Sequence, residues 1–232
     1  MRKKISLDEA ARLITRSLKP VFFLDTCVLL DVFRVVERTE SFNPFKLYLQ
    51  LAEKVKKDEV LVFINETIEN ELRYNTPIVV KEQRSKIQNL NRRWNAFRSL
   101  KDRKEVINEV NLSSDKIIRS AELTVHTILR NAYVIKNYDM ALRLSYEAVL
   151  SHKAPAARSS QFKDAYIFRT CLDLAKKSER SVIFCSTNTT DYCEDTRSKR
   201  VHPEIKSQAE VNNVLVALSL GDAYKLLIER NI

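Results

Sequence analysis

Acidic residues that could bind metal ions occur in four separated segments of the chain. Each lies beside a short apolar run or in the first turns of an amphipathic stretch. They are Asp25, Glu71, Asp164 and Asp191. Carboxylate oxygens are the ligands that Mg²⁺ and Mn²⁺ prefer, and two such cations about 3.5–4 Å apart can activate water for attack on a phosphodiester. A cluster of carboxylates also repels itself, so it has little value as a purely stabilising feature.

The apolar runs next to these acids are expected to form a parallel sheet. Short, continuously apolar strands that alternate with helices are typical of an α/β fold in which both faces of the sheet are covered. We expect strands at residues 21–24, 60–64, 181–185 and 214–218, and helices over residues 6–18, 26–37 and 162–177 and after residues 43 and 65. Ligands bind at the carboxyl ends of the strands in such sheets. The four acids are therefore expected at one rim.

Residues 76–150 are expected to be helical throughout, with no strand. We interpret them as a helical insertion within a single domain that spans residues 1–232. The first part, residues 81–104, carries nine Lys or Arg and two acidic residues. The excess of seven positive charges in residues 81–104 accounts for most of the net charge of +10 of the whole chain.

This local excess predicts a surface for a polyanion such as RNA. A solvated helix face is the simpler interpretation of a charged helix. The expected nucleic-acid-binding residues are Lys81, Arg84, Arg92, Arg93 and Arg98, with Arg158 and Lys163 near Asp164. Trp94 and Phe97 are interleaved and could offer stacking planes, although core positions are the simpler expectation.

The ordered set of motifs resembles that of PIN-domain ribonucleases, and among them the PIN-like proteins of the DUF4935 type. The motifs are Asp25-Thr-Cys-Val-Leu-Leu30, Glu71-Leu72, Asp164-Ala165 and Ser186-Thr-Asn-Thr-Thr-Asp-Tyr192, followed by His202-Pro203. The resemblance covers residues 19–75 and 151–232. It implies a PIN-like three-layer fold with a central parallel sheet, and metal-dependent hydrolysis of RNA phosphodiester bonds.

The resemblance also implies roles for individual residues. Asp25 would be the central ligand of Mg²⁺ or Mn²⁺, and Glu71 and Asp164 would complete the principal metal site. Asp191 and Ser186 would support a second metal or the attacking water, with Thr26 as a further supporting residue. Many PIN nucleases have Asp where this chain has Asn188. Whether the site binds a second metal ion therefore stays open.

The wider function that the resemblance implies is an endoribonuclease acting as a prokaryotic toxin or defence effector. Its partners would be single-stranded or structured RNA, an inhibitory protein and a second copy of the chain. Two alternatives stay open. One is a PIN-fold nucleic-acid-binding module with weak or no catalysis, which Asn188 favours. The other is a flap-type DNA nuclease in which residues 76–150 arch over single strands.

The composition excludes several other kinds of site. Gly221 is the only glycine, so glycine-rich nucleotide loops and G-x-S-x-G elbows cannot be present. No apolar run approaches about 18 residues, which predicts a cytoplasmic protein without a membrane partner. The four cysteines lack metal-binding spacing and are expected to be reduced, mostly buried thiols.

Simpler roles compete for some of the acids. Asp25 could cap the helix that follows it, and Asp164 is favoured by the helix dipole without any metal. Glu69 is expected to form a solvated ion pair with Arg73. Asp31 could be a carboxylate that supports the metal ligands, although a solvated helix face is the simpler expectation. Glu71 is harder to explain in this way, because it lies beside apolar residues.

Overall fold

The four apolar runs expected to form strands lie in the central sheet of the structure. They are β2 (Val21–Leu24), β3 (Leu61–Asn65), β5 (Val182–Cys185) and β6 (Val214–Ala217). Every residue of β2, β3 and β5 is buried. The computed structural model describes residues 3–34, 43–100, 113–156, 161–195 and 200–230, with the side chains of residues 45–96 in the second range.

Two further strands complete a six-stranded parallel sheet with the order β1-β4-β3-β2-β5-β6. They are β1 (Lys3–Ile5) and β4 (Tyr133–Ile135). The prediction that residues 76–150 contain no strand is therefore wrong. Each of the two strands has only three residues. β1 begins with two lysines, and β4 follows a helix so closely that its apolar residues extend the helical pattern. The expected α/β fold with a central parallel sheet is confirmed.

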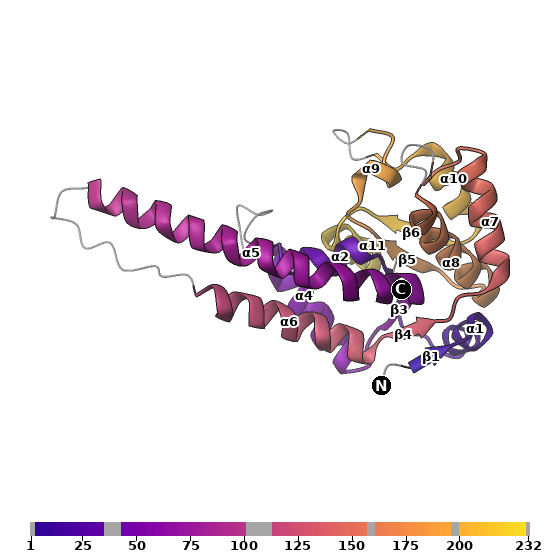
Figure 1. The fold of residues 1–232 in the computed structure, drawn as a ribbon. Coiled ribbons are helices and arrows are strands. Elements are labelled where there is room, and N and C mark those ends of the chain that lie inside the picture. The colour runs from indigo at the N-terminus through magenta and orange to yellow at the C-terminus, as the bar shows by residue number, and fades with distance from the viewer. Residues whose placement is uncertain (1–2, 35–42, 101–112, 157–160, 196–199, 231–232) are drawn as a thin grey trace.

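Helices cover both faces of this sheet, which gives three layers (Figure 1). On one face, α1 (Leu7–Thr15) and α7 (Asp139–Leu150) pack against α8 (Phe162–Ser178). On the other face, α4 (Asn43–Lys56) packs against α6 (Ser114–Asn131) and α11 (Leu220–Arg230). The remaining described helices are α2 (Thr26–Asp31), α5 (Glu66–Leu100), α9 (Thr189–Tyr192) and α10 (Pro203–Val211). Within the described ranges, no helix is both long and apolar enough to cross a membrane.

The helix α5 projects from the body as an arm, and α6 returns beside it (Figure 1). α5 has 35 residues and continues through Pro77. The boundary expected at residue 76 therefore does not interrupt the helix, because a proline removes only one of its many hydrogen bonds. The extent of the insertion and the single domain over residues 1–232 stay predictions.

The sheet brings three chain segments to one edge. β2 pairs with β3 on one side and with β5 on the other. The chain passes from β2 to β3 and from β5 to β6, in opposite directions across the sheet. The crevice at the carboxyl ends of the strands at such a switch point is where open α/β sheets bind ligands. Asp25 directly follows β2, α5 directly follows β3, and Ser186 directly follows β5.

Candidate active site

Asp25 lies at the carboxyl end of β2 and caps α2. Its Oδ1 accepts a hydrogen bond of 2.6 Å from the backbone N–H of Thr26. The capping role considered from the sequence is therefore confirmed. Its Oδ2 accepts hydrogen bonds from Ser186 Oγ at 2.6 Å and from Cys27 Sγ at 3.0 Å. The residue is only 3% exposed. A helix cap requires neither this burial nor the additional donors.

Glu71 reaches the same place from the second turn of α5. Its Oε2 accepts a hydrogen bond of 2.6 Å from Thr26 Oγ1, and its Oε1 lies 3.1 Å from Lys163 Nζ. Thr26 thereby joins two of the acids, because its N–H donates to Asp25 and its hydroxyl donates to Glu71. These contacts stabilise a carboxylate that the sequence places beside apolar residues.

Asn188 connects the other two acids. Its Nδ2 donates to Asp164 Oδ1 at 3.2 Å and to Asp191 Oδ2 at 2.7 Å. Its Oδ1 accepts a hydrogen bond from the N–H of Asp191, so the same side chain caps α9. Asp164 lies in the first turn of α8, and both acids are buried. Asn188 thus bridges two carboxylates without adding negative charge of its own.

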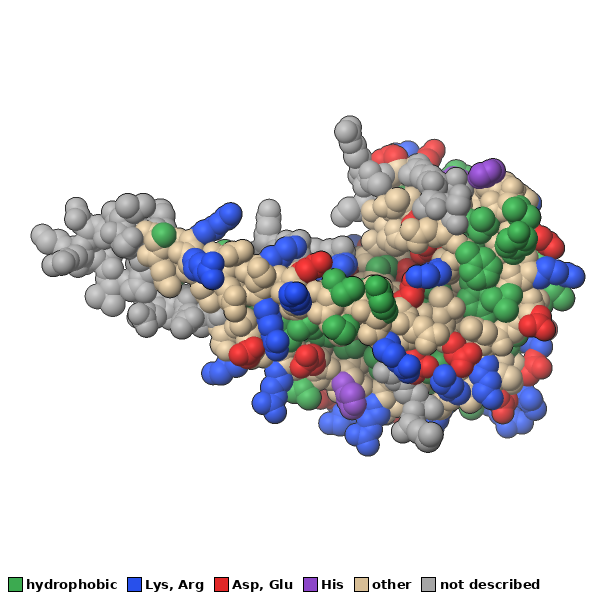
Figure 2. Space-filling model, in the orientation of Figure 1, with side chains coloured by type: hydrophobic (Ala, Val, Ile, Leu, Met, Phe, Trp, Pro, Cys, Tyr) green, Lys and Arg blue, Asp and Glu red, His purple; other side chains and the backbone are tan. Residues whose placement is uncertain are grey.

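The four carboxylates act on one another electrostatically. Burial, and then repulsion from Asp25, Asp191 and Glu71, raises the pKa of Asp164 to about 7. Burial also raises the pKa of Asp25, although hydrogen bonds to its carboxylate oppose the rise. Figure 2 shows acidic side chains gathered where α5 leaves the body. The structure therefore brings the four predicted acids together, in a buried concentration of negative charge that a cation would neutralise.

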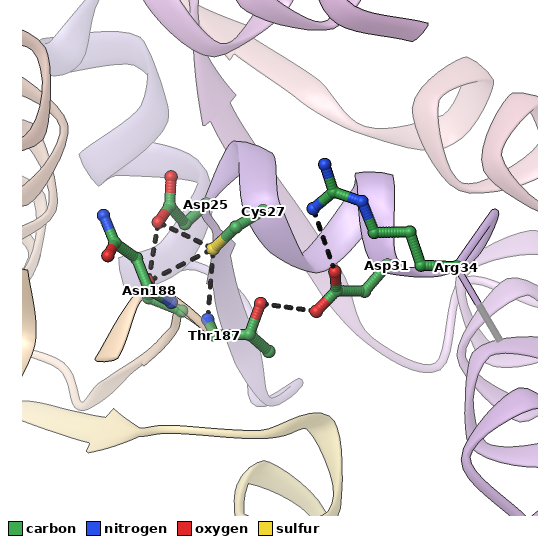
Figure 3. A network of polar contacts seen from close by, with 7 residues as sticks. Asp25, Cys27, Asp31, Arg34, Thr187 and Asn188 are labelled. Atoms are coloured by element: carbon green, nitrogen blue, oxygen red, sulfur yellow. Dashed lines mark hydrogen bonds and ion pairs between the residues drawn. The ribbon is translucent and has the colours of Figure 1, made fainter. Parts of the chain in front are cut away.

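Asp31 is another buried acid, and it supports the loop after β5 (Figure 3). Its Oδ2 accepts a hydrogen bond of 2.7 Å from Thr187 Oγ1, and its Oδ1 lies 3.5 Å from Arg34 Nη1. The N–H of Thr187 donates to Cys27 Sγ at 3.1 Å. The expectation that Asp31 lies on a solvated helix face is wrong, because nearly every residue of the six-residue α2 is buried. An acid at the end of the apolar run 28–30 was the available sequence signal.

Glu69 lies in α5 before Glu71 and does not form the expected solvated pair. It is 7% exposed, and its Oε2 lies 3.1 Å from Lys4 Nζ. Lys4 also contacts Glu66 at 3.0 Å. These acids of the first turn of α5 therefore bind β1, a strand that was not predicted. The cysteines are free thiols, as expected, and Cys27 is the half-buried one among them.

The basic residues expected to bind nucleic acid divide into two groups. Lys163 contacts the acidic cluster, whereas the exposed basic side chains Lys81, Arg84, Arg92 and Arg93 follow the arm. Arg84 Nε lies 3.6 Å from Asp115 Oδ1 of α6. Trp94 is 37% exposed, so the expectation of a core position for it is wrong. The side chains of Phe97 and Arg98 and the whole of Arg158 lie outside the described residues.

The donor set of the cluster fits a hard divalent cation such as Mg²⁺ or Mn²⁺. It consists of carboxylate oxygens with a serine hydroxyl beside them. Within the described part of the chain, however, no three or more His, Cys, Asp or Glu side chains are already arranged as a metal centre. The same carboxylates make contacts with other side chains. Lys163 Nζ takes Glu71 Oε1, and Asn188 is bonded to both Asp164 and Asp191.

The parallel sheet, its two covering layers of helices and the acids at the carboxyl ends of its strands form an α/β domain with an acidic edge. A family model described as a PIN domain matches residues 22–192, which is more than half of the chain, and the chain belongs to the PIN-domain family. No curated protein and no solved structure matches the chain. PIN domains are generally nucleases and typically use divalent metals. The resemblance drawn from the motifs is therefore confirmed at the level of the family.

Proposed function

We propose that this chain is a metal-dependent endoribonuclease whose metal ligands are Asp25, Glu71, Asp164 and Asp191. The observation that carries the proposal is the gathering of four carboxylates: Thr26 bonds to Asp25 and Glu71, and Asn188 bonds to Asp164 and Asp191. The rise in the pKa of Asp164 to about 7, through burial and then the charges of the other three acids, agrees with this crowding. Carboxylates that repel one another in a buried site destabilise the folded state unless a cation compensates them. In a PIN domain, the chemistry that fits such a cation is phosphodiester hydrolysis.

Mg²⁺ or Mn²⁺, when bound, would supply Lewis acidity and lower the pKa of a coordinated water. The residues of the chain prepare its ligands. Thr26 orients Asp25 and Glu71, and Ser186 fixes Asp25 Oδ2. The Lys163 side chain is 60% exposed, so it can release Glu71 and form an ion pair with a substrate phosphate instead. Hydrolysis is expected to leave a 5′-phosphate and a 3′-hydroxyl.

The arm supports RNA as the substrate. Residues 76–96 of α5 carry five Lys or Arg and one acid, Glu82. These basic side chains are exposed, and the first of them, Lys81, lies about 15 Å beyond Glu71 along the helix axis. A basic surface that leads to an acidic metal site is suited to a polyanion that the metal ions hydrolyse.

Cleavage of labelled tRNA and ribosomal RNA with Mn²⁺ or EDTA tests the proposal. Asp25→Asn and Asp164→Asn are expected to lower the rate by more than about 100-fold, beyond the effect of losing a residue that only supports a ligand. Asp58→Asn is the matched control. Its side chain is 74% exposed, and its φ of 58° is a conformation that Asn tolerates. Equal rates for the wild type and the two site variants would refute the proposal.

Two features of the site favour a second candidate, a PIN-fold nucleic-acid-binding module without catalysis. Asn188 stands where many PIN nucleases have an acid, and Lys163 occupies Glu71 Oε1. RNA binding without cleavage at any Mn²⁺ concentration would select this candidate. The arm beside the site favours a flap-type DNA nuclease, and a flap DNA substrate in the same assay tests that alternative.

We extend the first proposal to a cytoplasmic toxin or defence effector that an inhibitory protein restrains and that forms a homodimer. The family resemblance is its support. Induced expression of the wild type is expected to arrest bacterial growth, whereas Asp25→Asn is not. Equal growth would contradict the toxin role, and sedimentation of the purified chain measures the oligomeric state.

A further inference from the structure

An exposed apolar group lies on α5 next to the acidic cluster. Tyr74 is 74% exposed and Ile78 is 46% exposed, and Pro77 between them is exposed as well. Tyr74 follows Glu71 by three residues, so the two are neighbours on the helix surface, with Cβ atoms about 5–6 Å apart. Ile78 follows Tyr74 by four residues on the same face. The apolar group therefore begins beside the carboxylates and continues outward along the arm.

Packing against the described residues of the chain does not explain this group. α5 buries its opposite face through Leu72, Val79 and Ile87. Single exposed apolar residues are common on protein surfaces. Here three of them share one face, and one is a proline inside a helix, where it costs about 3 kcal/mol. Their concentration beside the candidate site indicates a binding surface.

Basic side chains continue the same face. Lys81 lies seven residues beyond Tyr74 and Arg92 lies 18 residues beyond it, which correspond to about two and about five helical turns. Both side chains are exposed. Figure 2 shows apolar and basic side chains together along the arm. A surface that combines an aromatic face with cations suits single-stranded nucleic acid, whose bases stack and whose phosphates attract positive charge.

We propose that Tyr74 stacks on a base of single-stranded RNA next to the scissile phosphate. Pro77 and Ile78 extend the apolar surface, and Lys81 and Arg92 bind phosphates further along the strand. This inference rests on the proposed function, because the acidic cluster determines which phosphate is cut. Paired bases are already stacked inside a helix, so duplex RNA gains nothing from Tyr74.

Binding of a fluorescein-labelled 12-nucleotide oligoadenylate, measured by anisotropy in EDTA, tests the proposal on the full chain. Stacking is worth about 1–3 kcal/mol per base, so Tyr74→Ala is expected to weaken binding roughly 5- to 150-fold. Tyr74→Phe keeps the ring and is expected to bind within about two-fold of the wild type. Tyr146→Ala removes a tyrosine on α7 that is 58% exposed, and it is the matched control. A duplex of the same length should show no effect of Tyr74→Ala.

Several results would overturn the inference. One is equal binding by the wild type and Tyr74→Ala, and another is equal weakening by Tyr74→Ala and Tyr74→Phe. A third is the absence of RNA binding by the wild type, which would point to a protein partner on this face. None of these measurements depends on cleavage. If the wild type cleaves RNA but Tyr74→Ala binds it equally well, the stacking proposal is refuted and the nuclease proposal stands. If RNA binding depends on Tyr74 but the wild type does not cleave RNA, the stacking proposal stands and the nuclease proposal is refuted.

Discussion

Lys163 Nζ and Glu71 Oε1 lie 3.1 Å apart, and this ion pair joins the first turn of α8 to the second turn of α5. The Lys163 side chain is 60% exposed, whereas that of Glu71 is 18% exposed. Exposed lysines form ion pairs that contribute only about 0–1 kcal/mol. The ammonium therefore holds a candidate metal ligand through a contact that is easily replaced.

Lys163→Gln is expected to tighten Mn²⁺ binding, because the cation no longer competes with the ammonium for Glu71. The upper limit for an exposed pair, about 1 kcal/mol, corresponds to about a five-fold change in affinity. Isothermal titration measures it without any need for catalysis. Lys206→Gln, which removes an exposed pair with Glu210 on α10, should leave the affinity unchanged. Weaker Mn²⁺ binding by Lys163→Gln would show that Lys163 supports the site instead of competing for it.

The free energy of unfolding of the metal-free protein is expected to fall as the pH rises from about 4 to about 7. The pKa of Asp164 is raised from 3.8 to about 7 in the folded state, so the folded state retains a proton that the unfolded state has already released. Above pH 7 both states have lost that proton, and the contribution levels off. It amounts to at most about 4 kcal/mol.

Urea unfolding in EDTA at pH 5.5 and pH 8 measures this contribution. Asp164→Asn should lose less stability than the wild type between the two pH values, because it has no proton to release. Asp58→Asn should behave like the wild type. The same pH dependence in the wild type and Asp164→Asn would show that the carboxyl group is not buried among other charges.

Thr187→Val is expected to lower the free energy of unfolding by about 1–3 kcal/mol. The substitution keeps the shape of the side chain but removes the hydroxyl that donates to the buried Asp31 at 2.7 Å. Urea unfolding measures the loss. In Thr127→Val, the lost hydroxyl bonds to a carbonyl within α6, and a change of less than about 0.5 kcal/mol is expected. An equally small change in Thr187→Val would mean that Asp31 does not depend on this bond.

Arg92→Gln is expected to weaken RNA binding and to reduce its dependence on salt. Each phosphate contact to a single strand contributes about 0.7 to the slope of log K against log [salt]. Anisotropy titrations at several NaCl concentrations give this slope. Lys57→Gln removes one charge from the turn that follows α4, where the side chain is 64% exposed, and should leave the slope unchanged. An unaltered slope for Arg92→Gln would place the RNA off the arm.

The central strands and the four acids were predictable because local patterns determine them. β2, β3 and β5 are fully buried, and all their residues are apolar except Asn65 at the end of β3. In a parallel sheet the carboxyl ends of neighbouring strands lie at the same edge. Asp25 after β2 and Ser186 after β5 were therefore expected to lie close together, and they are hydrogen-bonded at 2.6 Å. Local patterns were also sufficient for the capping role of Asp25.

The features that were missed depend on contacts between distant segments. Asp31 and Thr187 are 156 residues apart in the chain. The apolar run before Asp31 shows only that the acid adjoins buried residues, and it does not show which partner its carboxylate bonds to. Glu69 binds Lys4 of β1, whose charged three-residue strand is recognisable only by its pairing with β4. The bond from Thr26 to Glu71 likewise spans 45 residues.

The continuity of α5 has a consequence for the length of the substrate. Glu71 and Arg92 belong to one unbroken helix, so their separation along its axis is fixed at about 32 Å by the helical rise of 1.5 Å per residue. The two residues cannot approach each other without breaking the helix. An RNA strand that contacts both residues must span this distance. The length of α5 therefore sets a minimum length for an RNA that binds along the whole arm.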